Sequence, residues 1–88
     1  MAPKPAHGPA EGMGAVVAFT PSGFVTVRAR SSEVPLEGST VRESRGRLEG
    51  RVVRVFGPVA RPYVLLRPRR APTPVEGAAL LGAEVYRS

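Results

Sequence analysis

Glycine and proline interrupt this sequence so often that it has no room for a long helix. Ten residues of each type occur among its 88 residues, and proline breaks helices while glycine favours turns. The segments between them are short, apolar and rich in valine. This spacing predicts an all-β protein made of short strands and tight turns, with a single turn of helix over residues 75–81.

Six segments have the apolar character expected of strands. They cover residues 13–19, 24–30, 39–42, 47–56, 62–68 and 83–87. In the second segment, Val25, Val27 and Ala29 alternate with polar residues, which is the period of a strand with one buried face. Short strands joined by such turns favour a small closed six-stranded β-barrel, because closure removes the exposed edges of a sheet.

The chain is expected to form one domain, since 88 residues are too few for two hydrophobic cores. The barrel is predicted over residues 13–88. Residues 1–12 are rich in proline, alanine and glycine and have no periodic apolar pattern. This composition predicts a flexible N-terminal lead.

The fourth segment loses its alternation at Val52–Val53. Beyond this point Val53 and Val55 fall on the side that carries charged residues earlier in the segment. One interpretation is a β-bulge, which inserts one extra residue into a strand. The other is a strand buried on both faces near its end, with Val53 and Val55 turned toward a partner.

The connection after this segment is stiff and apolar. Gly57 can adopt a positive φ, and two nearby prolines fix the directions in which the chain enters and leaves. Phe56, Val59 and Tyr63 crowd around the connection. Because an exposed apolar tip is poorly suited to water, the sequence predicts that a protein partner covers it. The alternative for Phe56 and Tyr63 is packing in the barrel core.

The charge is concentrated in the middle of the chain. The net charge is +6, and residues 42–70 hold nine arginines against two glutamates, a balance of +7. Such a segment favours an anionic partner, either nucleic acid or an acidic protein face, although a solvated outer face is the alternative. The candidate contacts are Arg45, Arg47, Arg69 and Arg70. Glu43 and Glu49 are expected to form ordinary surface ion pairs.

Catalysis is not expected, because the chain has one histidine, no aspartate and no cysteine. No clustered metal ligands, cofactor motif or phosphate-binding loop occurs in the sequence, so no metal, cofactor or small-molecule substrate is expected. The absence of cysteine, of an apolar run of about 20 residues and of a signal-peptide pattern predicts a cytoplasmic protein without a membrane segment. Phe19 and Phe24 are expected in the core, which leaves no clear aromatic platform for reading RNA bases.

One stretch resembles a known family. Gly50-Arg51-Val52, Phe56-Gly57-Pro58-Val59 and Pro62-Tyr63 are similar to the signature of the Gar/Naf family, which includes the glycine-arginine-rich subunit of box H/ACA ribonucleoproteins. Residues 13–14, 36–41 and 81–86 agree with it. The glycine-arginine-rich tails of eukaryotic members are absent, so the chain resembles an archaeal core. Arg54 stands where many relatives carry an acidic residue.

The resemblance implies a six-stranded barrel similar to those of translation factors and reductases. It also implies a non-catalytic subunit that docks on the catalytic subunit of a guide-RNA pseudouridine synthase, has at most indirect contact with the guide RNA, and modulates the loading and release of substrate RNA. By this resemblance the partner-binding residues are Val53, Val55, Phe56, Gly57, Pro58, Val59, Pro62 and Tyr63. An autonomous basic β-barrel that binds RNA is the alternative, and the assembly-stage relative of the subunit also stays open.

Overall fold

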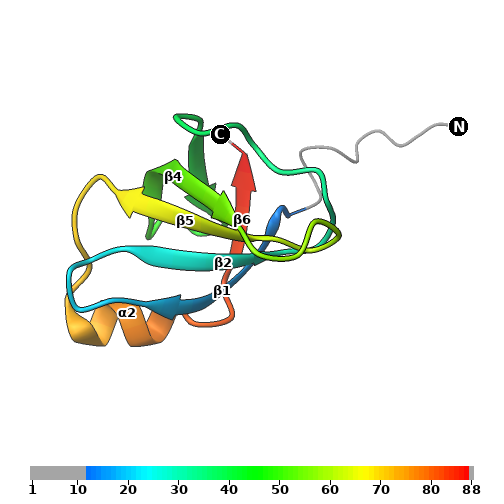
Figure 1. Ribbon diagram of the computed structural model, residues 1–88. Coiled ribbons are helices and arrows are strands. Elements are labelled where there is room, and N and C mark those ends of the chain that lie inside the picture. The colour runs from blue at the N-terminus through cyan, green and yellow to red at the C-terminus, as the bar shows by residue number, and fades with distance from the viewer. Residues whose placement is uncertain (1–11, 88) are drawn as a thin grey trace, which may run out of the picture.

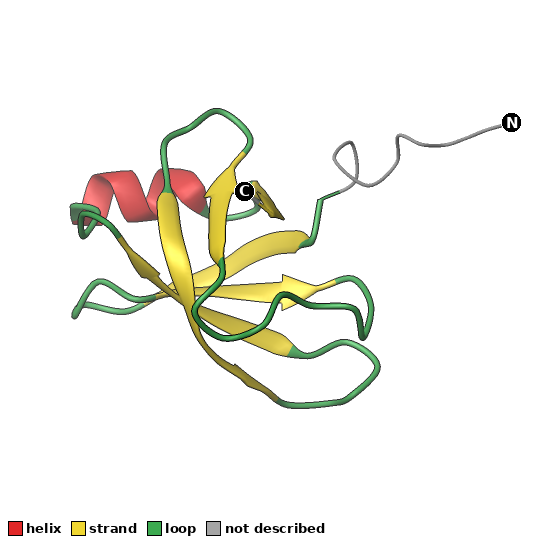
Figure 2. Cartoon of the chain, turned by 90° about the horizontal axis from the view of Figure 1, so that it is seen from above, coloured by secondary structure: helices red, strands yellow, loops and turns green. Residues whose placement is uncertain are grey.

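The six predicted strands close into one antiparallel barrel. The computed structural model describes residues 12–87, so the predicted lead lies outside the described residues except for Gly12. The elements are β1 (Gly14–Phe19), β2 (Val25–Ala29), β3 (Thr40–Glu43), β4 (Glu49–Phe56), β5 (Tyr63–Pro68), α2 (Pro74–Leu80) and β6 (Glu84–Arg87). Around the barrel the order is β1-β2-β5-β4-β3-β6 (Figures 1 and 2). The all-β, six-stranded class is therefore confirmed.

The core is built from the inward faces of these strands. Val25, Val27 and Ala29 are fully buried on β2, as their alternation predicts. They meet Val41, Val64, Leu66 and Val85 from the other strands in one cluster. Burying a valine contributes about 2 kcal/mol, so these side chains supply much of the stability of so small a domain. Phe19 packs against the edge of this cluster.

The helix has the length of the predicted segment, residues 75–81, and begins one residue earlier. α2 spans seven residues, and Thr73 caps its first turn by accepting a hydrogen bond from the Glu76 amide while Glu76 accepts one from the Thr73 amide. Gly77 lies directly on the Phe19 ring, where an added Cβ would sit 2.3 Å from Cζ. α2 therefore closes one end of the barrel, and Figure 1 shows it far from the connection between β4 and β5.

A β-bulge lies in β4 where the alternation breaks. Val52 pairs with Leu66 and Arg54 pairs with Leu65, so Val53 is the extra residue. The bulge inverts the alternation beyond it: Val55 packs against the core, whereas Arg54 and Phe56 are exposed. Of the two interpretations of the sequence, the bulge is correct and burial of the strand on both faces is wrong.

No helix among residues 12–87 has the length and apolar character that a membrane crossing requires.

Candidate functional site

An aromatic row crosses the outer face of three neighbouring strands. Tyr63 of β5 is paired with Arg28 of β2 on one side and with Phe56 of β4 on the other. The Phe56 and Tyr63 rings stack with centroids 5.5 Å apart and an interplanar angle of 22°. The Arg28 guanidinium carbon lies 4.6 Å from the Tyr63 centroid, and Nη1 donates to the Tyr63 hydroxyl at 2.8 Å. The three side chains therefore support one another.

The connection that follows Phe56 is held in place by backbone geometry. Gly57 has φ of +91°, and an added Cβ there would lie 2.9 Å from Cδ2 of Tyr63. Only glycine lets the chain turn this closely over the ring. The Arg28 Nε donates to the carbonyl of Arg61 at 3.0 Å, and the Ala29 amide donates to that of Pro62 at 2.9 Å. These bonds fasten the connection to β2.

Apolar side chains are also exposed on β4 and in the connection that follows it. Val59 is 84% exposed, and Val53 and Phe56 are each 40% exposed. The Arg54 guanidinium carbon lies 5.8 Å from the Phe56 centroid. We call this surface the docking face; it comprises Arg28, Val53, Arg54, Phe56, Val59 and Tyr63. Aromatic residues and arginine are the residue types enriched where proteins bind one another.

The eight residues that the sequence marks for partner binding are not equivalent. Val53, Phe56, Gly57, Pro58 and Val59 are exposed and Tyr63 is half-buried. Pro62 is buried and Val55 packs against the core, so these two can shape the surface only from beneath. Arg28 was missed, because its place in the row depends on a pairing with Tyr63, 35 residues away in the sequence.

Three of the four arginines marked for an anionic partner are in ion pairs. Arg47 pairs with Glu43 at 2.7 Å, Arg69 with Glu49 at 3.3 Å and Arg70 with Glu76 at 3.9 Å. The predicted surface pairing of Glu49 is confirmed. Arg45 has no ion pair within residues 12–87. Of these four arginines, Arg45 is therefore the one best able to meet an anionic partner.

Glu43 is not the surface residue that its neighbours suggest. It is 2% exposed, because β3 turns every second side chain inward and the following turn closes over it. Its carboxylate accepts hydrogen bonds from the Arg47 guanidinium at 2.7 Å and from the Arg47 amide at 2.9 Å. The Arg47 guanidinium, followed by backbone amides of the turn, lowers the pKa of Glu43 against the opposing effect of burial.

No cluster of three potential metal-ligating side chains occurs within residues 12–87. Comparison of the sequence with protein-family models gave no match, and neither did a search of curated proteins. The fold and the site together define a small closed β-barrel with an exposed aromatic face that is flanked by arginines.

Proposed function

We propose that this protein is a non-catalytic subunit of an H/ACA guide-RNA pseudouridine synthase and that its docking face binds the catalytic subunit. The observation that carries the proposal is the exposure of Val53, Phe56 and Val59 on a surface fastened in one geometry. These residues belong to the segment that resembles the Gar/Naf signature. In this role the protein acts in the cytoplasm in rRNA pseudouridylation and ribosome biogenesis.

The faces of the two stacked rings are partly covered by neighbouring side chains, which favours a protein partner over RNA at this face. Tyr63 is covered by Phe56 from β4 and by Arg28 from β2, the two strands that flank it. Arg54 lies near Phe56. Single-stranded nucleic acid binds aromatic residues by stacking bases on free ring faces. The docking face offers these partly covered rings together with valine methyl groups, which suit apolar protein side chains.

Docking can change the activity of the synthase only if it favours one conformation of the enzyme. We infer that the barrel binds more tightly when the loop that holds substrate RNA is in one of its two positions. A tenfold preference corresponds to about 1.4 kcal/mol, which is enough to shift the population of that loop. The proposed effects on substrate loading and product release follow from this coupling.

Co-purification tests the proposal directly. The full chain carrying an affinity tag is recovered from its native cell extract, and bound proteins are identified by mass spectrometry. Enrichment of a pseudouridine synthase catalytic subunit that disappears with Phe56→Ala supports the proposal. Absence of that enzyme from the recovered proteins, or equal recovery of the enzyme by the variant, contradicts it. The rival function, an autonomous RNA-binding barrel, predicts instead that no pseudouridine synthase is enriched with the chain.

A further inference from the structure

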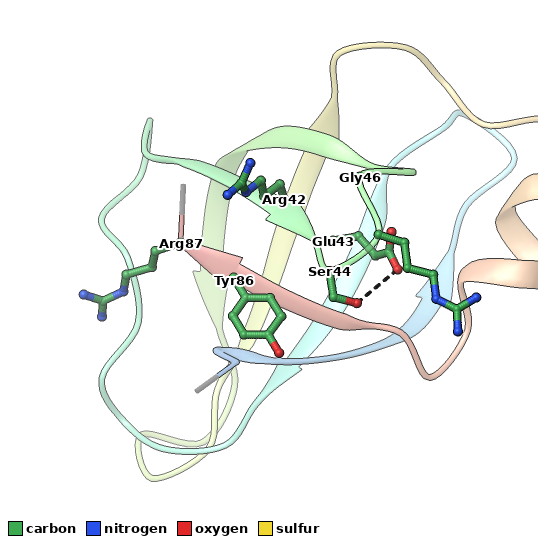
Figure 3. A pocket seen from close by; sticks show the side chains of 7 residues that line it. Arg42, Glu43, Ser44, Gly46, Tyr86 and Arg87 are labelled. Atoms are coloured by element: carbon green, nitrogen blue, oxygen red, sulfur yellow. Dashed lines mark hydrogen bonds between the residues drawn. The ribbon is translucent and has the colours of Figure 1, made fainter. Parts of the chain in front are cut away.

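A basic pocket lies on the side of the barrel away from the docking face. It has a volume of about 550 Å³ and opens between the β3–β4 turn and the end of β6 (Figure 3). Its charged and aromatic lining consists of Arg42, Glu43, Arg45, Tyr86 and Arg87. In the strand order of the closed barrel, β3 and β6 follow β4 and precede β1, whereas the aromatic row uses β2, β5 and β4. The two surfaces therefore occupy different parts of the barrel wall.

The pairing of β3 with β6 places the pocket's central side chains. Arg42 is directly opposite Tyr86, and their neighbours Val41, Glu43 and Val85 are buried. Since side chains alternate along a strand, Arg42 and Tyr86 both project from the outer face. Figure 3 shows Arg42 and Tyr86 leaving these two strands in different directions, and Arg87, the next residue along β6, pointing away from both. Arg45 comes from the turn that Gly46 closes with a φ of +78°.

The pocket has an unneutralised positive charge. Within residues 12–87, none of Arg42, Arg45 and Arg87 forms an ion pair. The one carboxylate in the lining is that of Glu43, which is buried and already bonded to Arg47. Three arginines thus line the pocket without an ion-pair partner in the described chain. Guanidinium groups bind phosphate oxygens well because their donors match that geometry.

Tyr86 differs from the aromatic residues of the docking face in its neighbours. It is half-buried and lines the pocket. Among residues 12–87, no other ring stacks on it and no guanidinium lies over it, in contrast to Phe56 and Tyr63. An aromatic ring with arginines around it is the combination with which proteins hold single-stranded nucleic acid.

From this combination we infer that the pocket binds a segment of single-stranded nucleic acid, with one base stacked on Tyr86 and its phosphates paired with Arg42, Arg45 and Arg87. The site does not depend on the identity of the docking partner. Its lining residues come from β3, β6 and the β3–β4 turn, and none of them belongs to the docking face. The same molecule can then hold a protein on one side and a nucleic acid strand on the other.

Fluorescence anisotropy on the isolated full chain tests the site. The probes are a labelled single-stranded RNA of about ten nucleotides, the same sequence as single-stranded DNA, and the corresponding duplex. Binding of either single strand in preference to the duplex supports base stacking, and the two single-stranded probes separate RNA from DNA. Tyr86→Leu should weaken binding by about tenfold or more, and Tyr86→Phe should retain it, because stacking needs the ring and not the hydroxyl.

Matched arginine variants distinguish binding at this pocket from non-specific attraction of nucleic acid to a positively charged protein. Arg42→Ala with Arg87→Ala should weaken binding at least about tenfold and reduce the log–log salt slope by about 0.7 for each phosphate that is no longer neutralised. Arg67→Ala with Arg70→Ala removes the same charge from β5 and the following loop, and should leave affinity within about threefold. Equal effects of the two double variants would overturn the proposal, as would an unchanged affinity in Tyr86→Leu.

A second readout covers the case in which Tyr86→Leu does not fold. In NMR spectra of the unaltered protein, the single strand should shift the amide signals of residues 42–46 and 86–87. Shifts confined to residues 53–63, or no shifts at all, would overturn the proposal. Equally strong competition by a polyglutamate peptide would also overturn it, because it would indicate an acidic protein as the ligand.

Discussion

Phe56 stacks on Tyr63 because the bulge at Val53 turns Phe56 outward. Without the extra residue, the alternation of β4 would direct Phe56 into the barrel and Val55 out of it. The stacked pair, with its centroids 5.5 Å apart, is therefore a product of a local irregularity in the backbone. An irregularity that exposes a phenylalanine and buries a valine costs the isolated barrel apolar burial, which favours a role for this surface in binding.

Removing the Phe56 ring should weaken docking more than folding. Phe56→Ala deletes an exposed, arginine-flanked ring at the centre of the docking face, and central aromatic residues contribute about 2 kcal/mol or more to binding. The decrease in folding stability should be about 1 kcal/mol, the worth of the stacking with Tyr63. Calorimetric titration against the synthase catalytic subunit measures the docking affinity, and thermal unfolding measures the folding stability. If Phe56→Ala binds the catalytic subunit with full affinity, Phe56 is not part of the interface.

Two exposed valines provide a matched comparison. Val59 on the docking face is 84% exposed and Val75 on α2 is 79% exposed. Val59→Ser should weaken docking by about 1 kcal/mol because less apolar surface is buried, and Val75→Ser should leave it unchanged. Neither change should alter the melting temperature appreciably, because neither side chain packs in the core. Equal effects of the two changes on docking would place the interface elsewhere.

Alanine variants of two glycines with positive φ distinguish the effect of backbone strain from the effect of contact with the docking face. Gly57 has φ of +91° and lies against the Tyr63 ring, whereas Gly46 has φ of +78° and has nothing within 4 Å of an added Cβ. Gly46→Ala should cost about 1 kcal/mol of stability from the left-handed backbone alone. Gly57→Ala should cost more and should also weaken docking, because the added methyl displaces Tyr63. Denaturant unfolding and calorimetric titration give the two quantities.

Glu43 should make the barrel sensitive to acid. Its pKa in the folded protein is lowered from 4.5 by the Arg47 guanidinium and the turn amides, so its contribution to stability is present above the unfolded value. That contribution disappears as the pH falls below 4.5 toward the lower folded pKa. Its bonds are worth about 2 kcal/mol at neutral pH. Glu43→Gln should lower the free energy of unfolding at pH about 7. It should also reduce the decrease in that free energy at acidic pH, measured by denaturant unfolding. An unchanged decrease would mean that other groups cause the loss of stability in acid.

The sequence predicted the strands well because glycine and proline mark their ends and the apolar alternation marks their faces. It also located the irregularity in β4, but it could not choose between a bulge and two-sided burial, since that choice depends on the register between Val52 and Leu66. The role of Arg28 could not be predicted for the same reason, since it depends on the pairing of Arg28 with Tyr63. Glu43 was misassigned for another reason: it shares the inward parity of Val41, but the arginines around it suggested a solvated turn.

Binding of the synthase at the docking face can be mapped by an NMR footprint of the complex. Isotope-labelled protein is titrated with the unlabelled catalytic subunit of the pseudouridine synthase, and the methyl signals of the valines are followed. If the docking face binds the enzyme, the signals of Val53 and Val59 shift or broaden while that of Val75 does not. Unperturbed Val53 and Val59 at a saturating concentration of the enzyme, or an effect centred on Val75, would contradict binding at this face.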